Sequence, residues 1–309
     1  MNLSILVGAG LVLLGGVLQG LFAVPMKFVQ RWNYENIWLV FALSGLVVFP
    51  WLLTATTVPH LGAVYRLTST HSIIAITGFG LCWGAGATLT GLGLSMLGIG
   101  LGFAIILGLS ASVGSLVPLL VLTPQKVGTS QGHLYFLGTA VMLIGIVAAA
   151  RAGSLRDLSK EPVDSICGVK IKGYLLARLV VAISAGLLSS ALNFSYAFGT
   201  EPSRRHAIWG SPVWMSNVVA APATSGGFSA NCLYCLYLLY KNSTAGDFWI
   251  PDLRINWLYA SRGAAVWAAR HLPFPEEFKP FPQYLGGASA PAGGTCGAIF
   301  RALISRLYI

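Results

Sequence analysis

Long stretches without charged residues dominate the chain, and short polar segments separate them. A helix that spans a bilayer needs about 20 mainly apolar residues, and a charge at mid-membrane is costly. Such stretches lie between residues 1 and 27, 35 and 66, 66 and 126, 126 and 151, 178 and 201, and 205 and 241. The third is long enough for two helices, with a glycine-rich turn at residues 97–102. The pattern predicts an all-α integral membrane protein, a helical bundle of about seven transmembrane helices.

The polar segments predict how these helices are grouped. Basic residues gather in the connections after the first, third, fifth and seventh predicted helices, which places those connections in the cytoplasm and the amino terminus outside. The most charged segment, residues 152–173, is predicted as a cytoplasmic linker. It separates a first five-helix half, residues 1–151, from a partial second half, residues 174–241. An odd number of spans per half favours an inverted repeat, with the second copy incomplete here.

The pattern changes near the carboxyl end of the chain. After Tyr259, charged residues interrupt every apolar window, and prolines from Pro273 onwards exclude a long helix. The sequence therefore predicts an aberrant, irregular tail over residues 242–309.

Composition agrees with the membrane assignment. Charged residues make up 9% of the chain, against roughly 25% in soluble domains, and the mean hydropathy is +0.74. The net charge of +10 fits cytoplasmic loops rather than nucleic-acid binding, because no basic run is interleaved with aromatic residues. Cys232 and Cys235 form a lone CxxC without neighbouring histidines, which supplies two ligands where structural zinc takes four. We therefore expect no metal and no other cofactor.

Several short motifs together resemble the L-rhamnose/proton symporter (RhaT) family of the drug/metabolite transporter superfamily. They are Val24-Pro25-Met26-Lys27, Trp32, Glu35, Trp38, Pro50-Trp51, Phe79-Gly80-Leu81-Cys82-Trp83-Gly84-Ala85-Gly86, Gly91-Leu92, Leu97-Gly98, the glycine-rich helix to Pro118, Leu143-Ile144-Gly145, Arg151-Ala152-Gly153 and Ser184-Ala185-Gly186. The resemblance covers roughly residues 5–245. It implies ten helices in two inverted halves, so three would be missing here. We interpret the tail after about Tyr259 as the product of a frameshifted or misassembled reading frame, which would make the chain a truncated transporter.

Polar residues inside apolar stretches are the candidate substrate ligands, because a polar group in lipid is expensive. Gln19 and Asn193 carry amides that could bond a sugar hydroxyl or a neighbouring helix. Tyr196 lies one turn after Asn193 and on the same helix face. Trp83 offers a flat ring for stacking on a sugar, with small neighbours that leave space, although plain packing explains it too.

Two basic residues near helix ends are candidates for gating or for neutralising an anion. Lys27 and Arg178 could equally be anchors whose charges reach the headgroups. Glu35 is expected at the interface as a cap, so no buried carboxylate is predicted as a proton carrier. Gly98 and Gly102 form a GxxxG that permits close helix packing.

These observations favour a secondary transporter of a small polar solute in the inner membrane. The resemblance implies symport of a sugar, L-rhamnose, with a proton. An integral-membrane enzyme acting on a lipid-linked substrate is the alternative, disfavoured because the histidines lack paired carboxylates. A non-functional truncated transporter is a third possibility. The expected partners are the bilayer, the sugar and the proton, with no nucleic acid. We expect low stability unless two copies form a homodimer.

Overall fold

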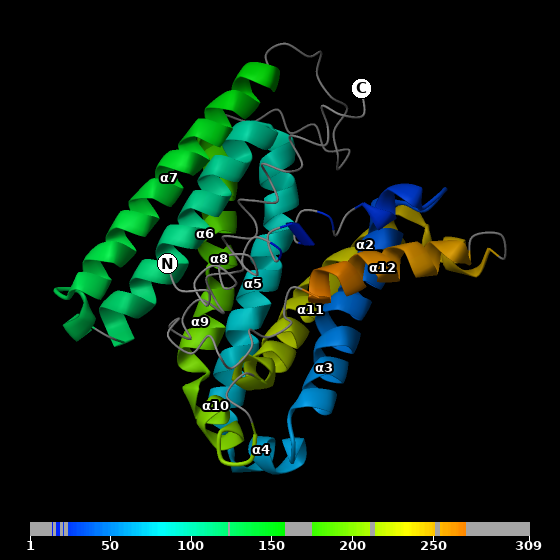
Figure 1. Ribbon diagram of the computed structural model, residues 1–309. Coiled ribbons are helices and arrows are strands. Elements are labelled where there is room, and N and C mark those ends of the chain that lie inside the picture. Colours follow the sequence, from blue (N-terminus) through cyan, green and yellow to red (C-terminus); the bar gives the residue numbers. More distant parts are fainter. Residues whose placement is uncertain are drawn as a thin grey trace. The chain divides into compact units, whose positions relative to one another are not determined.

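The computed structural model describes residues 24–122, 124–157, 175–210, 214–250 and 254–269, together with 14, 17, 18 and 21. Within these residues the fold is helical and contains no strand (Figure 1). The α-helices are α2 (Tyr34–Ala42), α3 (Phe49–Thr57), α4 (Leu61–Leu67), α5 (Thr70–Leu97), α6 (Ile99–Leu122), α7 (Ser130–Asp157), α8 (Leu175–Ser189), α9 (Ala191–Phe198), α10 (Thr200–His206), α11 (Met215–Asn242) and α12 (Ile255–Ala269). Short helical turns are η1 (Pro25–Phe28), η3 (Pro124–Lys126) and η5 (Ala245–Trp249), and η2 (Leu43–Val48) is a π-helix.

Four described helices are long and apolar enough to cross a membrane: Tyr34–Thr57, Thr70–Leu94, Ala104–Leu122 and Ala177–Phe198. They coincide with the second, third, fourth and sixth predicted spans. The helices α7 and α11 also form where the fifth and seventh spans were predicted, but neither is among these four. The first predicted span lies almost wholly outside the described residues. The count of seven and the inverted repeat therefore stay predictions, whereas an all-helical membrane protein is confirmed.

By their internal contacts, the residues form two compact units. Unit 1 comprises Met1–Leu81 and Ser195–Ile309, and unit 2 comprises Cys82–Phe194. The chain passes between the units within α5 and within α9. This grouping is not the division into sequential halves at residues 1–151 and 174–241, which stays a prediction. The described end of α7 at Asp157 also extends helix into the predicted linker.

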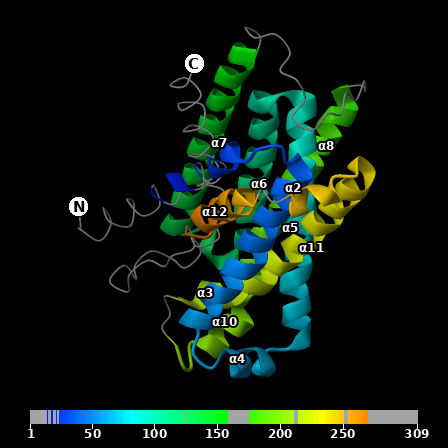
Figure 2. The same ribbon diagram turned by 90° about the vertical axis from the view of Figure 1, so that its right-hand side faces the viewer.

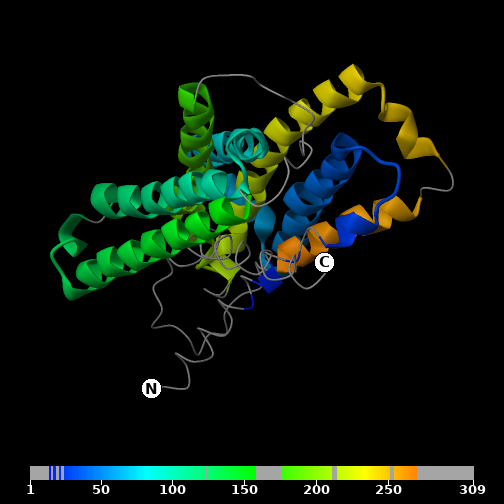
Figure 3. The ribbon, with the colours of Figure 1, turned by 90° about the horizontal axis from the view of Figure 1, so that it is seen from above.

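Unit 2 contains the hairpin of α6 and α7, whose helices run side by side, with α8 packed on α6 (Figures 1 and 3). Its core joins Ile106 of α6 to Ala182 and Ala185 of α8. The turn predicted at residues 97–102 forms at Gly98, whose φ of 81° suits glycine. Gly98 therefore lies between two helices, so the two glycines do not share one helix face, although Gly102 itself packs closely on α5, where a Cβ atom would lie 2.8 Å from Leu94 Cδ2.

Unit 1 is built around α2, η2 and α3, which pack against α11 and α12. Figure 2 shows α3 beside α11, and α4 beside α10 at the far end. The π-helix η2 ends two residues before Pro50, whose missing N–H prevents an ordinary helical bond to Leu46. Trp32, Val40 and Ala260 form a buried cluster where α2 meets α12.

The expectation of an irregular tail from residue 242 is wrong for its first part. Residues 245–249 form η5, and residues 255–269 form α12. Ala260 and Ala264 are fully buried, and the Asn256 side chain both accepts from the Gln30 N–H and donates to the Gln30 carbonyl. A helix with one face packed on protein needs no uniformly apolar sequence. The tail beyond residue 269 lies outside the described residues.

Candidate functional site

Asn193 places an amide among the apolar helices of unit 2. Its helix α9 brings the side chain to Gly114 of α6, where a Cβ atom would come 2.1 Å from Asn193 Nδ2. Pro118 has no N–H, so the Gly114 carbonyl lacks its helical donor at this point. Asn193 Oδ1 is buried and has no hydrogen-bond partner among the described residues. It is therefore an acceptor available to a hydroxyl.

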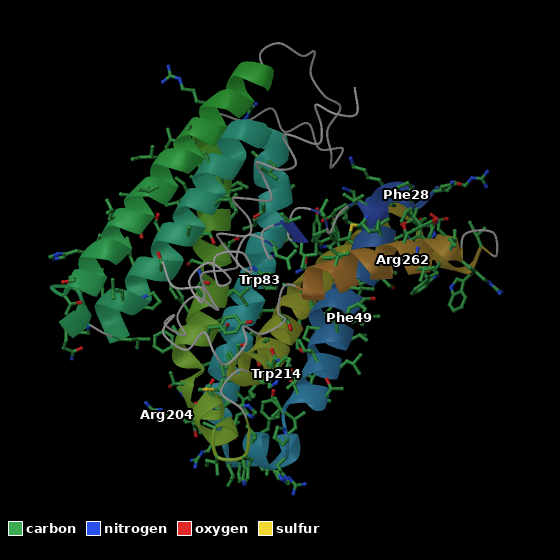
Figure 4. All side chains as sticks on the ribbon, in the orientation of Figure 1. Phe28, Phe49, Trp83, Arg204, Trp214 and Arg262 are labelled. Carbon is green, nitrogen blue, oxygen red and sulfur yellow. The ribbon has the colours of Figure 1, made fainter. Side chains whose placement is uncertain are left out.

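Trp83 lies on α5 in the same unit and is half-buried (Figure 4). The small residues beside it do not leave open space. A Cβ atom on Gly86 would lie 2.6 Å from the backbone nitrogen of Ser189, so α8 fills that position. Gly84 and Gly86 are both buried, and Gly86 lies in the contact between α5 and α8. The structure thus assigns these glycines to helix packing, while the role of Trp83 itself stays a prediction.

The remaining predicted ligands are placed less fully. Tyr196 is half-buried on α9, three residues after Asn193, and belongs to unit 1. Gln19 lies outside the described residues. Asn193 and Tyr196 both lie on α9, while a shared helix face and a shared ligand stay predictions.

Of the two predicted basic residues, Arg178 has the more informative surroundings. Arg178 Nη1 donates to the Met96 carbonyl over 3.3 Å, in the last turn of α5. The carbonyl end of a helix carries partial negative charge and unsatisfied acceptors, so a cation is favourable there. Its Nε is buried without a partner among the described residues. Lys27 is exposed in η1, as an anchor would be.

Glu35 is a buried carboxylate that sequence reasoning missed. Its exposed fraction is 3%, although it lies at the first turn of α2. Glu35 Oε1 accepts hydrogen bonds from Asn242 Nδ2 and from Thr244 Oγ1, both at 2.9 Å. Glu35 lies in the first turn of α2 as expected, but it is also buried, because the end of α11 and the residue before η5 fold over this turn. Hydropathy along the chain contains no signal for that contact.

Asn36, the next residue, extends this polar cluster. It is fully buried, and its Nδ2 donates to the Thr244 carbonyl over 3.0 Å. Asn36 Oδ1 is buried without a hydrogen-bond partner among the described residues. We call Glu35, Asn36, Asn242 and Thr244 the α2–α11 polar cluster.

A buried polar face runs along α11 in unit 1. Asn217, Thr224 and Asn231 recur every seven residues and are all nearly inaccessible. Asn231 Oδ1 accepts from Trp38 Nε1 at 2.8 Å, and the Asn217 carbonyl accepts from Thr54 Oγ1 at 3.0 Å. This spacing is visible in the sequence and could have identified the face before the structure.

Pro222 interrupts the hydrogen bonds of α11 next to this face. It cannot donate to the carbonyl of Val218, and the Tyr65 hydroxyl donates to that carbonyl instead, at 2.8 Å. Burial raises the pKa of Tyr65, which keeps the hydroxyl protonated as a donor. The proline is thereby accommodated without leaving a buried acceptor unpaired.

Glu201 forms a separate polar contact at the α4–α10 end of unit 1. Its carboxylate accepts from the Ser69 N–H at 3.0 Å, from Ser69 Oγ at 2.6 Å and from Ser72 Oγ at 2.5 Å. These donors belong to the beginning of α5, where an anion is favoured. The bonds from Ser69 and Ser72 lower the pKa of Glu201 to about 2. Arg204, on the same short helix α10, points away from the ribbon (Figure 4).

The chain is similar to known sugar transporters over most of its length. A family model described as L-rhamnose-proton symport protein (RhaT) matches residues 1–272. The L-rhamnose-proton symporter of Cronobacter sakazakii is 29% identical over 268 residues, which cover 82% of this chain and 74% of that protein. Proteins of the same name from Klebsiella pneumoniae and Escherichia coli are each 27% identical; the matches cover 86% of this chain and 78% and 80% of those proteins. No solved structure matches the chain.

The family match reaches further than residues 5–245, where the motifs quoted above lie. It continues past Tyr259 to residue 272 and so includes the whole of α12. The departure from the family therefore does not begin at Tyr259. Because the match covers most of the chain, this protein belongs to the L-rhamnose-proton symport (RhaT) family.

Proposed function

We propose that this chain carries L-rhamnose together with a proton across the inner membrane. The observation that carries the proposal is the family match over residues 1–272, joined by relatives that bear this name. The chain is a multi-pass inner-membrane transporter rather than an enzyme, so the alternative of an enzyme for lipid-linked substrates is not retained. The bilayer is its environment.

For the sugar, we propose contacts with Asn193 and Trp83, and with Gln19 and Tyr196. The contact with Asn193 has the strongest support, because its Oδ1 is a buried acceptor that receives no hydrogen bond from the described residues. A sugar hydroxyl that donates to it would remove the cost of the unpaired acceptor, about 1–3 kcal/mol. The hydrogen bond from Arg178 to the Met96 carbonyl supports a role for Arg178 in fixing the end of α5. Lys27 and Arg178 are retained as gating candidates.

The test is uptake of labelled L-rhamnose by cells that express the chain. Asn193→Ala should raise the KM of uptake, because it removes the acceptor. Asn256→Ala is the matched control: it also removes a buried asparagine, but one whose partners lie within the protein. Equal KM values for the two variants and the unchanged chain would remove Asn193 from the site. Absence of L-rhamnose uptake in all three would contradict the proposed solute.

Truncation and dimerisation remain proposals with their own measurements. Re-reading the nucleotide sequence that follows residue 272 in the other two frames tests the frameshift hypothesis, and a lack of apolar spans there would contradict it. Mass measurement of the detergent-purified protein tests the homodimer, which a monomeric species would exclude.

A further inference from the structure

The α2–α11 polar cluster contains the only buried carboxylate among the residues whose exposure the structure describes. Symport of a proton needs a group that binds and releases it, and carboxylates inside membrane proteins are the usual carriers. Unit 2 offers buried polar atoms at Asn193 and Arg178 but no described buried acid. Among the described residues, Glu35 is therefore the buried group that can bind and release a proton.

The hydrogen-bond partners of Glu35 are neutral, and its burial acts against the charge that they favour. Burial opposes the charged form, while the two donors at Oε1 favour it. Both donors are neutral, and no ion pair holds the carboxylate within the described residues. A permanent ion pair would fix the charge, so its absence is what a reversible proton site requires.

The titratable groups around Glu35 are few. From α11, the buried Cys235 thiol lies near it. Lys241 on α11 is exposed, and Asp247 on η5 is half-buried and contacts Trp32 through its backbone carbonyl. From α12, Arg262 is exposed. None of these charges pairs with Glu35 in the described part of the chain.

Asn36 provides a second, independent observation. Its side chain is fully buried and bonds the same residue, Thr244, as the carboxylate does, and no described donor satisfies its Oδ1. This unpaired acceptor would gain a hydrogen bond from a water molecule that enters the cluster, and such a water could deliver a proton to the carboxylate.

We propose that Glu35 is the proton-binding residue of the transport cycle, an inference that rests on the proposed function. The proton passes from water to a carboxylate oxygen and returns to water on the other side, with no other bond made or broken. Neutralising Glu35 weakens its bonds from Asn242 and Thr244, because donors bond a charged carboxylate more strongly than a neutral acid. The attachment of α2 to the end of α11 thus depends on protonation.

The test uses the full chain, purified and reconstituted in proteoliposomes. Glu35→Gln is the most informative variant, because the bonds from Asn242 and Thr244 both end on Oε1 and the amide oxygen of glutamine can accept both. Glu201→Gln is the matched control, since it removes a carboxylate that lies outside the cluster. We expect Glu35→Gln to lose L-rhamnose accumulation driven by an acid exterior while it keeps counterflow, which needs no net proton movement. Glu201→Gln should keep both.

Gradient-driven accumulation by Glu35→Gln at the level of the unchanged protein would overturn the proposal. Loss of both activities in a protein with an unchanged melting temperature would also overturn it, because Glu35 would then serve the solute rather than the proton. If Glu35→Gln does not fold, Thr244→Val serves instead. It removes one donor that favours the charged carboxylate, so the half-maximal pH of uptake should move upward, and an unchanged pH would contradict the proposal.

Failure of the proposed function is separable from failure of this inference. If the unchanged protein carries no L-rhamnose, infrared difference spectra between acid and neutral pH still report proton binding. A carboxylic-acid band present in the unchanged protein and in Glu201→Gln, but missing from Glu35→Gln, would support a proton site that serves another solute. A band that persists in Glu35→Gln would overturn it.

Discussion

The contact between α5 and α11 in unit 1 allows one substitution to be predicted in detail. A Cβ atom on Gly80 would lie 1.9 Å from the Ala223 carbonyl oxygen and 2.7 Å from its carbon. Both atoms belong to the backbone of α11, so no side chain can rotate away, and the helices must separate. Overpacking of this kind costs about 1–3 kcal/mol. The gain in helix propensity from glycine to alanine, about 1 kcal/mol, offsets only part of a loss near the upper end.

Because the clash is with backbone, we take the upper end of the overpacking cost, about 3 kcal/mol, and expect Gly80→Ala to lower the free energy of unfolding by about 2 kcal/mol after the gain in helix propensity. Gly226→Ala should behave alike, because its Cβ would lie 2.1 Å from the Thr77 carbonyl oxygen in the same contact. The assay is reversible denaturant unfolding in detergent. Either substitution alone already separates α5 from α11. The double variant should therefore lose less free energy of unfolding than the two single variants lose together.

Gly78→Ala is the matched control for this prediction. It lies on the same helix, and nothing comes within 4 Å of its added Cβ atom. Its stability should stay unchanged or rise by up to about 1 kcal/mol through helix propensity alone. If Gly80→Ala proves as stable as Gly78→Ala, the close approach of α5 and α11 is refuted, and with it the placement of these two helices in unit 1.

Three further substitutions test other contacts. Tyr65→Phe should lower unfolding stability by about 1–3 kcal/mol, because the Val218 carbonyl beside Pro222 loses its donor; Tyr240→Phe, at an exposed residue, is the control in the same denaturation assay. Glu201→Gln should lower the melting temperature at neutral pH. Because the pKa of Glu201 is lowered from 4.5 to about 2, its stabilisation exists above the unfolded pKa and disappears as the pH falls to about 2, so the two melting curves should converge there. Gly114→Ala should displace Asn193 and raise the KM of L-rhamnose uptake, whereas Gly145→Ala, with no neighbour within 4 Å, should leave it unchanged.

The helices were predictable because the membrane imposes a length and a composition that one sequence displays. Tyr34–Thr57 and Ala177–Phe198 formed within the stretches that their lack of charge had marked. The turn at Gly98 was predictable too, since only a glycine adopts its φ of 81° without strain. Helix α12 was missed because hydropathy averages over all faces, whereas Ala260 and Ala264 present a single face to the protein.

The candidate site was predicted in part, and the difference has one physical cause. Asn193 was identifiable because an amide in an apolar stretch is costly wherever the helix lies. Glu35 was not, because its burial depends on Asn242 and Thr244, more than two hundred residues away in the chain. A residue near the end of a span is exposed or buried according to which loop folds over it, and local sequence does not determine that loop.

Helix α11 shows how a weak hydropathy signal can itself be informative. Its apolarity is reduced by residues such as Asn217, Thr224 and Asn231, which recur every seven positions and so occupy one face. In a helix that faced only lipid, such a row would remain unpaired and costly. A polar row with helical spacing therefore predicts a protein-facing surface, and the bonds of Asn231 with Trp38 and of Asn217 with Thr57 supply side-chain partners on this surface. By the same reasoning, polar residues that recur at helical spacing in a predicted span indicate a helix that packs against other helices.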